Sequence, residues 1–321
     1  MRYKLSAPAT LHTTIQLPAS KSISNRALIL HALAQGHIAP SNLSDCDDTR
    51  VMIKALDGNP GHIDILAAGT AMRFLTAYLS VTPGTRIITG TERMQQRPIR
   101  ILVDALRELG AQIEYAGKEG FPPLRITGTE LTGEEISLAG NVSSQYISAL
   151  LMIGPILKNG LRLNLTGEII SRPYINLTLQ LMKEFGADAA WSSESSITVR
   201  PEKYRDIPFT VESDWSGASY WYQMVALIQD NEKKESTKTE IKLPGLLPRS
   251  YQGDSRGAEI FAKLGVHTTY TDQGVVLTKM GTPVTCLKED LVDIPDLAQT
   301  FVVTCCLMNI PCLLYTSPSP R

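Results

Sequence analysis

The chain has 321 residues, a length typical of about two domains, and its 31 basic and 32 acidic residues give a net charge of −1. Its composition, with 43% hydrophobic, 20% charged and 6% aromatic residues, is that of a globular protein and excludes collagen, coiled-coil and disordered classes. Because no broad positive surface is expected, binding to nucleic acid or to an anionic membrane is excluded, and any anion site must be local.

The five cysteines indicate a reducing compartment. Their number is odd, and they lack the paired spacing of a zinc ribbon or a redox motif. Cys305 and Cys306 lie in the apolar run Phe301–Met308, which predicts two buried, unreactive thiols. No apolar stretch has the length of a signal sequence or of a membrane span, so we expect a cytoplasmic protein.

In chain order, helical periodicity alternates with short strand-like runs, which predicts an α/β fold. A strand over Thr13–Leu17 precedes a helix that starts near Ser20. Three later helices end on Gly110, Gly186 and Gly265 and lead directly into short strands, at a spacing of roughly 80 residues. The spacing indicates repeated βα subunits, although helix, glycine and strand also follow one another in unrelated α/β proteins.

The helix after Ser20 combines the features of an anion site. Ser20 or Ser22 can cap its N-terminus, and its apolar stripe leaves Ser22 and Arg26 one turn apart on another face. Lys21 lies in the first turn, where a purely structural helix more often carries an acidic residue. Backbone N–H groups, an ammonium and a guanidinium therefore meet at one helix end, which favours a bound anion over a structural role.

Further helix starts have the same character. They occur at Gly69–Thr70, within the basic segment Arg93–Arg100, at Ser143–Gln145 and at Ser171–Arg172. Each alone is better explained as an ordinary helix cap. Together, in a chain of nearly neutral charge, they predict a cleft in which several helix N-termini meet a polyanionic small molecule.

Asp296 is the candidate for proton transfer. It is expected in the first turn of an otherwise apolar helix, where a carboxylate is favourable either as a base or simply as a cap. The sequence has no Walker loop, dinucleotide-binding glycine motif, HExxH motif or nucleophile elbow. Neither a metal nor another cofactor is therefore expected.

Three segments mark breaks in the pattern. A strand is expected over Phe209–Glu212, and the charged stretch Asp230–Ser236 is expected to be a solvated loop. The last ten residues, 312–321, contain two prolines among serines just where a strand should follow the helix Leu297–Met308. We therefore expect a foreign tail at 312–321.

Eight segments together resemble the 5-enolpyruvylshikimate-3-phosphate (EPSP) synthase family, in the order in which that family carries them. Between about residue 5 and about residue 311 they read LPASKSISNRALIL, DCDDTRVMIKAL, AAGTAMRFL, MQQRPIRILVDALRELGA, GNVSSQYISALLM, ISRPYINLTLQLMKEFGA, SYQGDSRGAEIFAKLGV and IPDLAQTF. The resemblance implies a transferase of the shikimate pathway, in the biosynthesis of chorismate and aromatic amino acids. In its reaction the 5-hydroxyl of shikimate 3-phosphate adds to C2 of phosphoenolpyruvate, and the adduct loses phosphate. Both substrates are anions, as the helix starts require.

Carried over position by position, the resemblance implies the residues of the site. Those for phosphoenolpyruvate are Lys21, Gly69, Arg97 and Gln145. Those for shikimate 3-phosphate are Lys21, Ser22, Arg26, Ser143, Ser144, Gln145, Ser171, Tyr174 and Asp296. Asp296 and Lys21 are implied to be catalytic, with Asp296 as the candidate base for the 5-hydroxyl. The resemblance implies no cofactor and no metal, and a monomer.

The family's fold implies two lobes, each built from repeated βαβαββ units with the helices inside. One lobe is expected over residues 20–208. The other would combine residues 1–19 with 209–311 and would be incomplete, with 312–321 outside the family. The chain is thus expected to be a C-terminally truncated member.

Two residues depart from the family's pattern near Gly69. Ala67 stands where Asn is usual, and Phe74 stands where Pro is common. Gly69 favours sensitivity to the family's inhibitor glyphosate, whereas these two departures weaken that expectation.

Two alternative functions stay open. UDP-N-acetylglucosamine enolpyruvyl transferase shares the fold, but it typically has Lys-Asn where this chain has Lys21-Ser22, and a loop cysteine that Thr91–Arg97 lacks. Alternatively, the chain is an inactive remnant that retains partial binding of shikimate 3-phosphate.

Overall fold

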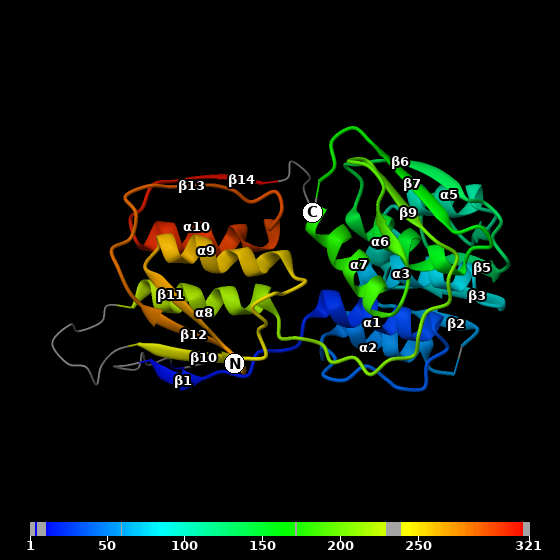
Figure 1. Ribbon diagram of the computed structural model, residues 1–321. Helices are drawn as coiled ribbons and strands as arrows, with labels where there is room; N and C mark the ends of the chain where they lie inside the picture. Colours follow the sequence, from blue (N-terminus) through cyan, green and yellow to red (C-terminus); the bar gives the residue numbers. More distant parts are fainter. Residues whose placement is uncertain (1–3, 5–10, 59, 171, 229–238, 317–321) are drawn as a thin grey trace. The chain divides into compact units, whose positions relative to one another are not determined.

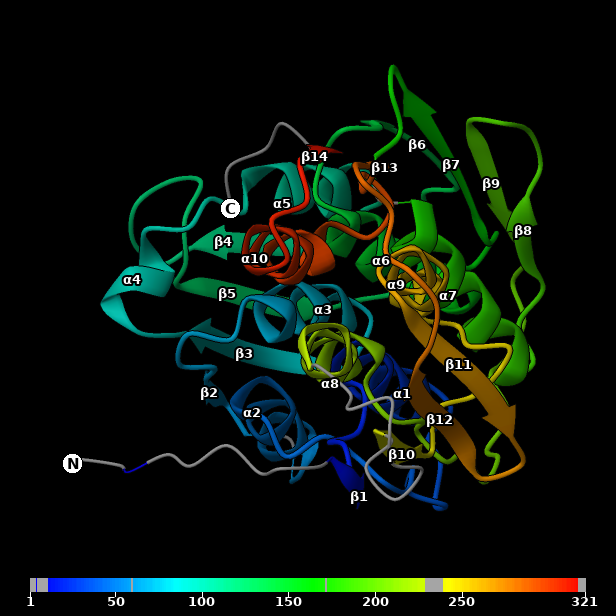
Figure 2. The ribbon, with the colours of Figure 1, turned by 90° about the vertical axis from the view of Figure 1, so that its left-hand side faces the viewer.

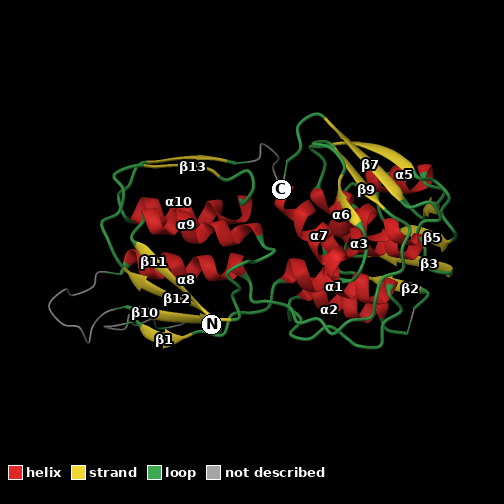
Figure 3. Ribbon diagram, in the orientation of Figure 1, coloured by secondary structure: helices red, strands yellow, loops and turns green. Residues whose placement is uncertain are grey.

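The computed structural model describes residues 4, 11–58, 60–170, 172–228 and 239–316, in two compact units (Figure 1). Unit 2 is continuous from Ala19 to Val211, whereas unit 1 combines Met1–Pro18 with Glu212–Arg321. Helices and strands alternate in both units, which confirms the α/β class (Figure 3).

Unit 2 repeats one arrangement of helices and strands. Its elements are α1 (Lys21–Leu33), α2 (Asp47–Leu56), β2 (His62–Asp64), α3 (Gly69–Ser80), β3 (Gly84–Thr89), α4 (Glu92–Gln95), α5 (Arg100–Glu108), β4 (Gln112–Tyr115), β5 (Leu124–Gly128), β6 (Glu135–Ala139), α6 (Ser144–Ile153), the 3₁₀ helix η1 (Gly154–Ile156), β7 (Leu161–Thr166), α7 (Arg172–Glu184), β8 (Ala189–Trp191) and β9 (Ser196–Val199). The strands form two sheets, ordered β2-β3-β5-β4 (Figure 2) and β6-β7-β9-β8. In each sheet the first pair is parallel and the other pairs are antiparallel. The βαβαββ repeat is therefore confirmed.

The helices α3 and α6 form the interior of unit 2 and pack against each other. Every residue of α3 from Gly69 to Ala77 is buried, as is every residue of α6 from Tyr146 to Ile153. A helix that is buried on all sides lies in a core, whereas a helix on a surface buries a single stripe. The predicted arrangement with helices inside the sheets is thus confirmed.

Unit 1 carries the same arrangement and two additional strands. Its elements are β1 (His12–Thr14), α8 (Trp215–Leu227), β10 (Glu240–Pro244), the 3₁₀ helix η3 (Gly253–Arg256), α9 (Gly257–Lys263), β11 (Val266–Thr271), β12 (Gly274–Lys279), β13 (Leu287–Asp290), the 3₁₀ helix η4 (Pro295–Leu297), α10 (Ala298–Leu307) and β14 (Cys312–Tyr315). The order β1-β10-β12-β11, with a parallel first pair, matches the sheets of unit 2. Its core contains a row of aromatic rings, Trp215, Tyr222, Phe261 and Phe301, whose successive centroids lie 6.4, 5.2 and 4.7 Å apart.

The three glycines that end helices adopt the backbone conformation expected of them. Gly110 after α5, Gly186 after α7 and Gly265 after α9 have φ angles of 106°, 87° and 84°. A side chain is strained at such angles, so glycine allows the chain to leave the helix and enter the next strand at once.

Two expectations about strands are wrong. No strand forms over Phe209–Glu212, because Ser41 alone lies opposite and makes a single parallel bridge with Thr210. The expected break after the last helix is also wrong, since Cys312–Tyr315 forms β14. This strand pairs in parallel with β13, with Leu287 opposite Cys312. The remainder of the expected tail, 317–321, and the expected loop Asp230–Ser236 lie outside the described residues.

The expectation of two buried thiols on the last helix is half right. Cys305 is buried, and burial beside Cys312 raises the pKa of its thiol to about 12. Cys306 is exposed, because successive residues of a helix point in different directions. Cys305 lies on the buried side of α10, so the next residue points away from the core.

Candidate active site

Helix α1 begins at Lys21 with an open N-terminus. Ser20 is the N-cap residue, but its side chain makes no capping hydrogen bond to the first backbone N–H groups. The Lys21 side chain is exposed, and within the described residues it pairs with no carboxylate. An uncapped positive helix end and an unpaired ammonium together favour an anion.

Arg26 lies one turn further along α1 and is buried, with 3% of its surface exposed. Its Nη1 donates to the carbonyl oxygen of Ser22 at 2.9 Å, and its Nη2 and Nε donate to Ser148 Oγ and Thr178 Oγ1 at 3.1 and 2.7 Å. Its Cζ lies 5.2 Å from the centroid of the Phe74 ring. The guanidinium therefore links α1 to α6 and α7 and lies deeper than the open face that the sequence pattern suggested.

Arg26 keeps its charge despite this burial. Loss of hydration lowers the pKa of its guanidinium to about 10, against a smaller opposing contribution from Tyr174, so the group is protonated at neutral pH. No carboxylate of the described residues pairs with it. A guanidinium has five N–H groups, and the contacts above leave one on each terminal nitrogen. Arg26 therefore retains donors for an anion.

Gly69 starts α3 beneath two guanidinium groups. A Cβ atom added to this residue would lie 2.6 Å from Arg97 Nη1 and 2.8 Å from Arg73 Nη1. Arg73 Nη1 also donates to the Gly69 carbonyl oxygen at 2.8 Å. A side chain at this position would displace the two guanidinium groups. Glycine thus allows an approach that concentrates positive charge at an N-terminus that is already the positive end of its helix.

The start of α6 is joined to the start of α3. Ser143 is the N-cap of α6, and its Oγ accepts from the backbone N–H of Gln145 at 3.4 Å. The side-chain Nε2 of Gln145 donates to Thr70 Oγ1 at 3.2 Å. Ser143 is exposed, and Ser144 and Gln145 are half-buried, so all three side chains are accessible beside the Gly69 start.

The start of α7 is linked to Arg26 and to α6 through Thr178. Thr178 Oγ1 lies 2.8 Å from Ser148 Oγ and bonds to the carbonyl oxygen of Tyr174 at 2.9 Å. Tyr174 is half-buried in the first turn of the helix. Ser171, which precedes α7, lies outside the described residues.

Asp296 belongs to unit 1 and lies in η4, a 3₁₀ turn ahead of α10. The expected position in the first turn of an α-helix is therefore wrong, because Asp296 lies in the short element before that helix. Pro295 begins this tighter turn, and α10 starts at Ala298. The Asp296 carbonyl oxygen accepts from Gln299 Nε2 at 2.7 Å, and its half-buried side chain carries a carboxylate at this end of α10.

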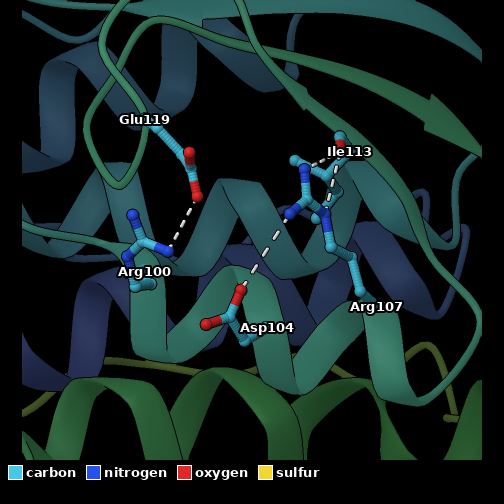
Figure 4. Close-up of polar contacts among 5 residues, drawn as sticks. All are labelled: Arg100, Asp104, Arg107, Ile113 and Glu119. Atoms are coloured by element: carbon cyan, nitrogen blue, oxygen red, sulfur yellow. Dashed lines mark hydrogen bonds and ion pairs between the residues drawn. The ribbon is translucent and has the colours of Figure 1, made fainter.

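Arg100 of the predicted basic segment, and Arg107 further along α5, are already occupied. Arg100 donates to Glu119 at 2.8 Å, and Arg107 donates to the Ile113 carbonyl oxygen and lies 4.0 Å from Asp104 (Figure 4). Arg97, by contrast, is exposed, and its guanidinium has no carboxylate partner among the described residues. Arg93 is exposed and, in the described part of the chain, unpaired in the same way, but Arg97 is the one of the two that approaches Gly69.

Unit 2 thus carries the N-termini of α1, α3 and α6 and the cations Lys21, Arg26, Arg73 and Arg97. Of these, Arg73 and Arg97 meet at Gly69, and Gln145 links the starts of α3 and α6. Such a site binds anions through backbone N–H groups and charge-assisted hydrogen bonds. The sequence analysis did not single out Arg73 or Tyr146 as site residues. Arg73 follows Gly69 by one helical turn, which is a signal that could have identified it, whereas nothing in the sequence pattern distinguishes Tyr146 from a core aromatic residue.

Known proteins are similar to this chain over most of its length. The family profile described as EPSP synthase (3-phosphoshikimate 1-carboxyvinyltransferase) matches residues 5–58 and 59–316. A 3-phosphoshikimate 1-carboxyvinyltransferase of Bacteroides fragilis is 71% identical over 311 residues, which is 97% of this chain and 74% of that protein. The chain belongs to the EPSP synthase family. A relative with the same name from Pseudoalteromonas atlantica is 37% identical over 94% of this chain and 74% of its own length.

Solved structures of the family share the fold. The EPSP synthase from Acinetobacter baumannii matches with a TM-score of 0.71 at 20% identity, over 91% of this chain and 70% of that one. The enolpyruvyl transferase NikO from Streptomyces tendae matches with a TM-score of 0.67 at 14% identity, over 96% of this chain and 76% of that one. At these identities the similarity concerns the fold. Among the described residues, no helix combines the length and the apolar character that crossing a bilayer requires.

Proposed function

We propose that this chain transfers the enolpyruvyl group of phosphoenolpyruvate to the 5-hydroxyl of shikimate 3-phosphate and releases phosphate. The observation that carries the proposal is the meeting of Gly69, Gln145 and Arg97 at adjoining helix starts within a chain of the EPSP synthase family. Both proposed substrates carry a carboxylate and a phosphate, which are the groups that helix N-termini and guanidinium ions bind.

The proposed site divides into two sets of residues. The residues assigned to phosphoenolpyruvate are Lys21, Gly69, Arg97 and Gln145. The residues assigned to shikimate 3-phosphate are Lys21, Ser22, Arg26, Ser143, Ser144, Gln145, Ser171, Tyr174 and Asp296. The uncapped start of α1 and the accessible side chains of Ser143 and Ser144 at the start of α6 support the assignment of the serines. The free donors of Arg26 suit a buried carboxylate or phosphate oxygen.

The proposed chemistry is one addition followed by one elimination. A base removes the proton of the 5-hydroxyl while its oxygen bonds to C2 of phosphoenolpyruvate and C3 gains a proton. Loss of a proton from C3 then restores the double bond as the C2–O bond to phosphate breaks. Asp296 is the proposed base, and the Lys21 ammonium is proposed to stabilise the negative charge of the departing phosphate.

The test is an assay of phosphate release with both substrates, combined with calorimetry. We expect the unmodified chain to release phosphate only when both are present. Arg97→Ala or Lys21→Ala should reduce phosphoenolpyruvate affinity at least about tenfold, because each removes a charge-assisted contact. Arg100→Ala is the matched control, since Arg100 is also exposed but is paired with Glu119. Unchanged affinity in Arg97→Ala would overturn its assignment.

The same assay separates the alternatives. Thermal stabilisation by shikimate 3-phosphate without phosphate release would indicate a remnant that binds one substrate and does not react. Phosphate release with UDP-N-acetylglucosamine in place of shikimate 3-phosphate would indicate the sister reaction. Neither outcome is expected.

Three finer expectations follow from the family resemblance. Residues from a single chain supply the whole proposed site, so the reaction needs no second copy of the chain, and the resemblance implies an enzyme of the cytoplasm. Glyphosate is the expected competitor of phosphoenolpyruvate, because Gly69 leaves the space under Arg97 free of a side chain. Inhibition that is relieved by added phosphoenolpyruvate would support this.

A further inference from the structure

Tyr146 connects the two parts of the proposed phosphoenolpyruvate site. It follows Gln145 in α6, and its side chain is buried, with 7% exposed. Its hydroxyl donates to the carbonyl oxygen of Pro98 at 2.9 Å. Since Pro98 follows Arg97 directly, this hydrogen bond joins the Gln145 helix to the segment that carries Arg97.

The segment that carries Arg97 has few other restraints. It lies between the end of α4 at Gln95 and the start of α5 at Arg100. The backbone N–H of Arg97 donates to the Met94 carbonyl oxygen at 3.0 Å, which is a contact with the preceding turn only. Pro98 has no N–H group to donate. The next N–H, that of Ile99, donates to the Gly120 carbonyl oxygen at 3.0 Å, so the Pro98–Ile99 peptide is held on both sides. Of these bonds, the one from Tyr146 joins this peptide to the interior helix α6.

The charges around Gly69 make such a restraint necessary. Arg73 Nη1 and Arg97 Nη1 both approach the position that a Gly69 side chain would occupy. Two guanidinium ions at this separation repel each other, and the Arg97 charge adds to burial in lowering the pKa of Arg73. This repulsion opposes the approach of Arg97 to Gly69.

Tyr146 also supports the second guanidinium. The Arg73 Cζ lies 5.9 Å from the centroid of the Tyr146 ring, within the range of a cation–π contact. Arg73 in turn holds the Gly69 carbonyl oxygen at 2.8 Å. The Tyr146 side chain thus contacts both Arg73, which holds the start of α3, and the peptide that follows Arg97.

We propose that Tyr146 is a positioning residue for phosphoenolpyruvate, whose hydroxyl holds the Pro98 peptide so that Arg97 stays over Gly69. The inference rests on the proposed function, because it assigns the consequence of the hydrogen bond to phosphoenolpyruvate. Tyr146 itself is not proposed to touch the substrate.

The test compares Tyr146→Phe with Tyr204→Phe. The first removes the hydroxyl, and with it both the bond to Pro98 and the hydrogen bond with the Arg73 side chain, and it keeps the ring beside Arg73. The second is a matched control, because the buried Tyr204 hydroxyl makes the same kind of bond, 2.7 Å to the Met152 carbonyl oxygen near the far end of α6. Each variant is measured for thermal stability, for KM and kcat with both substrates, and for hydrogen exchange of a peptide that covers residues 95–102.

We expect Tyr146→Phe to raise the KM for phosphoenolpyruvate about three- to tenfold, the usual effect of a lost hydrogen bond. Its kcat and its KM for shikimate 3-phosphate should change less than about twofold, and exchange at the Arg97 amide should be faster. Tyr204→Phe should lose similar stability and show neither effect.

The outcomes separate the two proposals. Unchanged exchange over residues 95–102 in Tyr146→Phe would overturn the restraint itself, whether or not the chain is active. Faster exchange with an unchanged KM for phosphoenolpyruvate would overturn the positioning role and leave the proposed function intact. If the unmodified chain neither binds phosphoenolpyruvate nor releases phosphate, the proposed function fails, while exchange still decides whether Tyr146 restrains Arg97.

Discussion

Glu212 is a buried carboxyl group at the first residue of unit 1 after the chain leaves unit 2. It is 6% exposed, and its Oε1 accepts from Ser250 Oγ at 2.6 Å and from Gln252 Nε2 at 2.9 Å. Burial raises its pKa above the usual value of 4.5, and these hydrogen bonds oppose the rise only in part. The ionised form therefore costs folding free energy at neutral pH.

We predict that Glu212→Gln removes this cost. Because the folded-state pKa is raised, the protonated carboxyl stabilises the native chain at acidic pH, and this stability is lost as the pH rises through the folded-state pKa. The amide keeps an acceptor for Ser250 and does not ionise. The unfolding free energy of Glu212→Gln, relative to that of the unmodified chain, should therefore increase from acidic to neutral pH. Urea denaturation at each pH measures both values. Exposed Glu259→Gln is the control, and parallel pH profiles for Glu212→Gln and the unmodified chain would contradict the prediction.

At the scale of elements, helix starts were predictable because their signals are local. Ser143 caps α6 and Gly69 begins α3, as the sequence pattern indicated, since a cap and its first turn lie within four residues. The burial of Arg26 was not predictable in this way. Its partners Ser148 and Thr178 lie 122 and 152 residues further along the chain, so only the packing of α1 against α6 and α7 reveals them.

Strands were less predictable than helices, because a strand needs a partner. The segment Cys312–Tyr315 precedes a proline- and serine-rich sequence, yet it forms a strand where β13 offers a free edge. Phe209–Glu212 also has the sequence pattern of a strand, but its backbone forms a single bridge, between Thr210 and Ser41. Hydrogen-bonding partners that are distant in sequence thus decided both cases.

Helix α8 in unit 1 depends on a single well-formed cap. Asp214 Oδ1 accepts from the backbone N–H groups of Ser216 and Gly217 at 2.8 and 3.2 Å. We predict that Asp214→Ala lowers the unfolding free energy by about 1 kcal/mol, the usual cost of a lost cap. Asp214→Asn should lose much less, because its amide oxygen still accepts. Equal losses in the two variants, measured by urea denaturation, would argue against a capping role.

At the scale of the whole molecule, the spacing of three glycines predicted the repeat that both units display. The local sequence of helix, glycine and strand recurs because each βαβαββ unit ends its helices in the same way. The pairing β3-β5 and its counterparts could not be predicted from this pattern, since these strands skip one neighbour along the chain. Asp296 was expected in the first turn of an α-helix, but it lies in η4, and α10 begins two residues later.

Unit 1 exposes an apolar surface on α10 and β14, which lie in contact. Val303 and Leu307, one turn apart on α10, are 48% and 62% exposed, and Leu313 and Tyr315 on β14 are 48% and 57% exposed. Several exposed apolar side chains on neighbouring elements favour association, whereas isolated ones do not. This surface therefore opposes the monomer that the resemblance implies.

We predict that the chain self-associates through this surface as its concentration rises. Leu307→Glu places a charge at the most exposed of these side chains, and it should raise the concentration needed for association at least about tenfold, since a buried unpaired carboxylate is costly. Met280→Glu is the control, because Met280 is 59% exposed but lies in the turn after β12, away from α10. Sedimentation velocity over a concentration series measures the effect. A single monomeric species at every concentration of the unmodified chain would show that α10 and β14 do not mediate association.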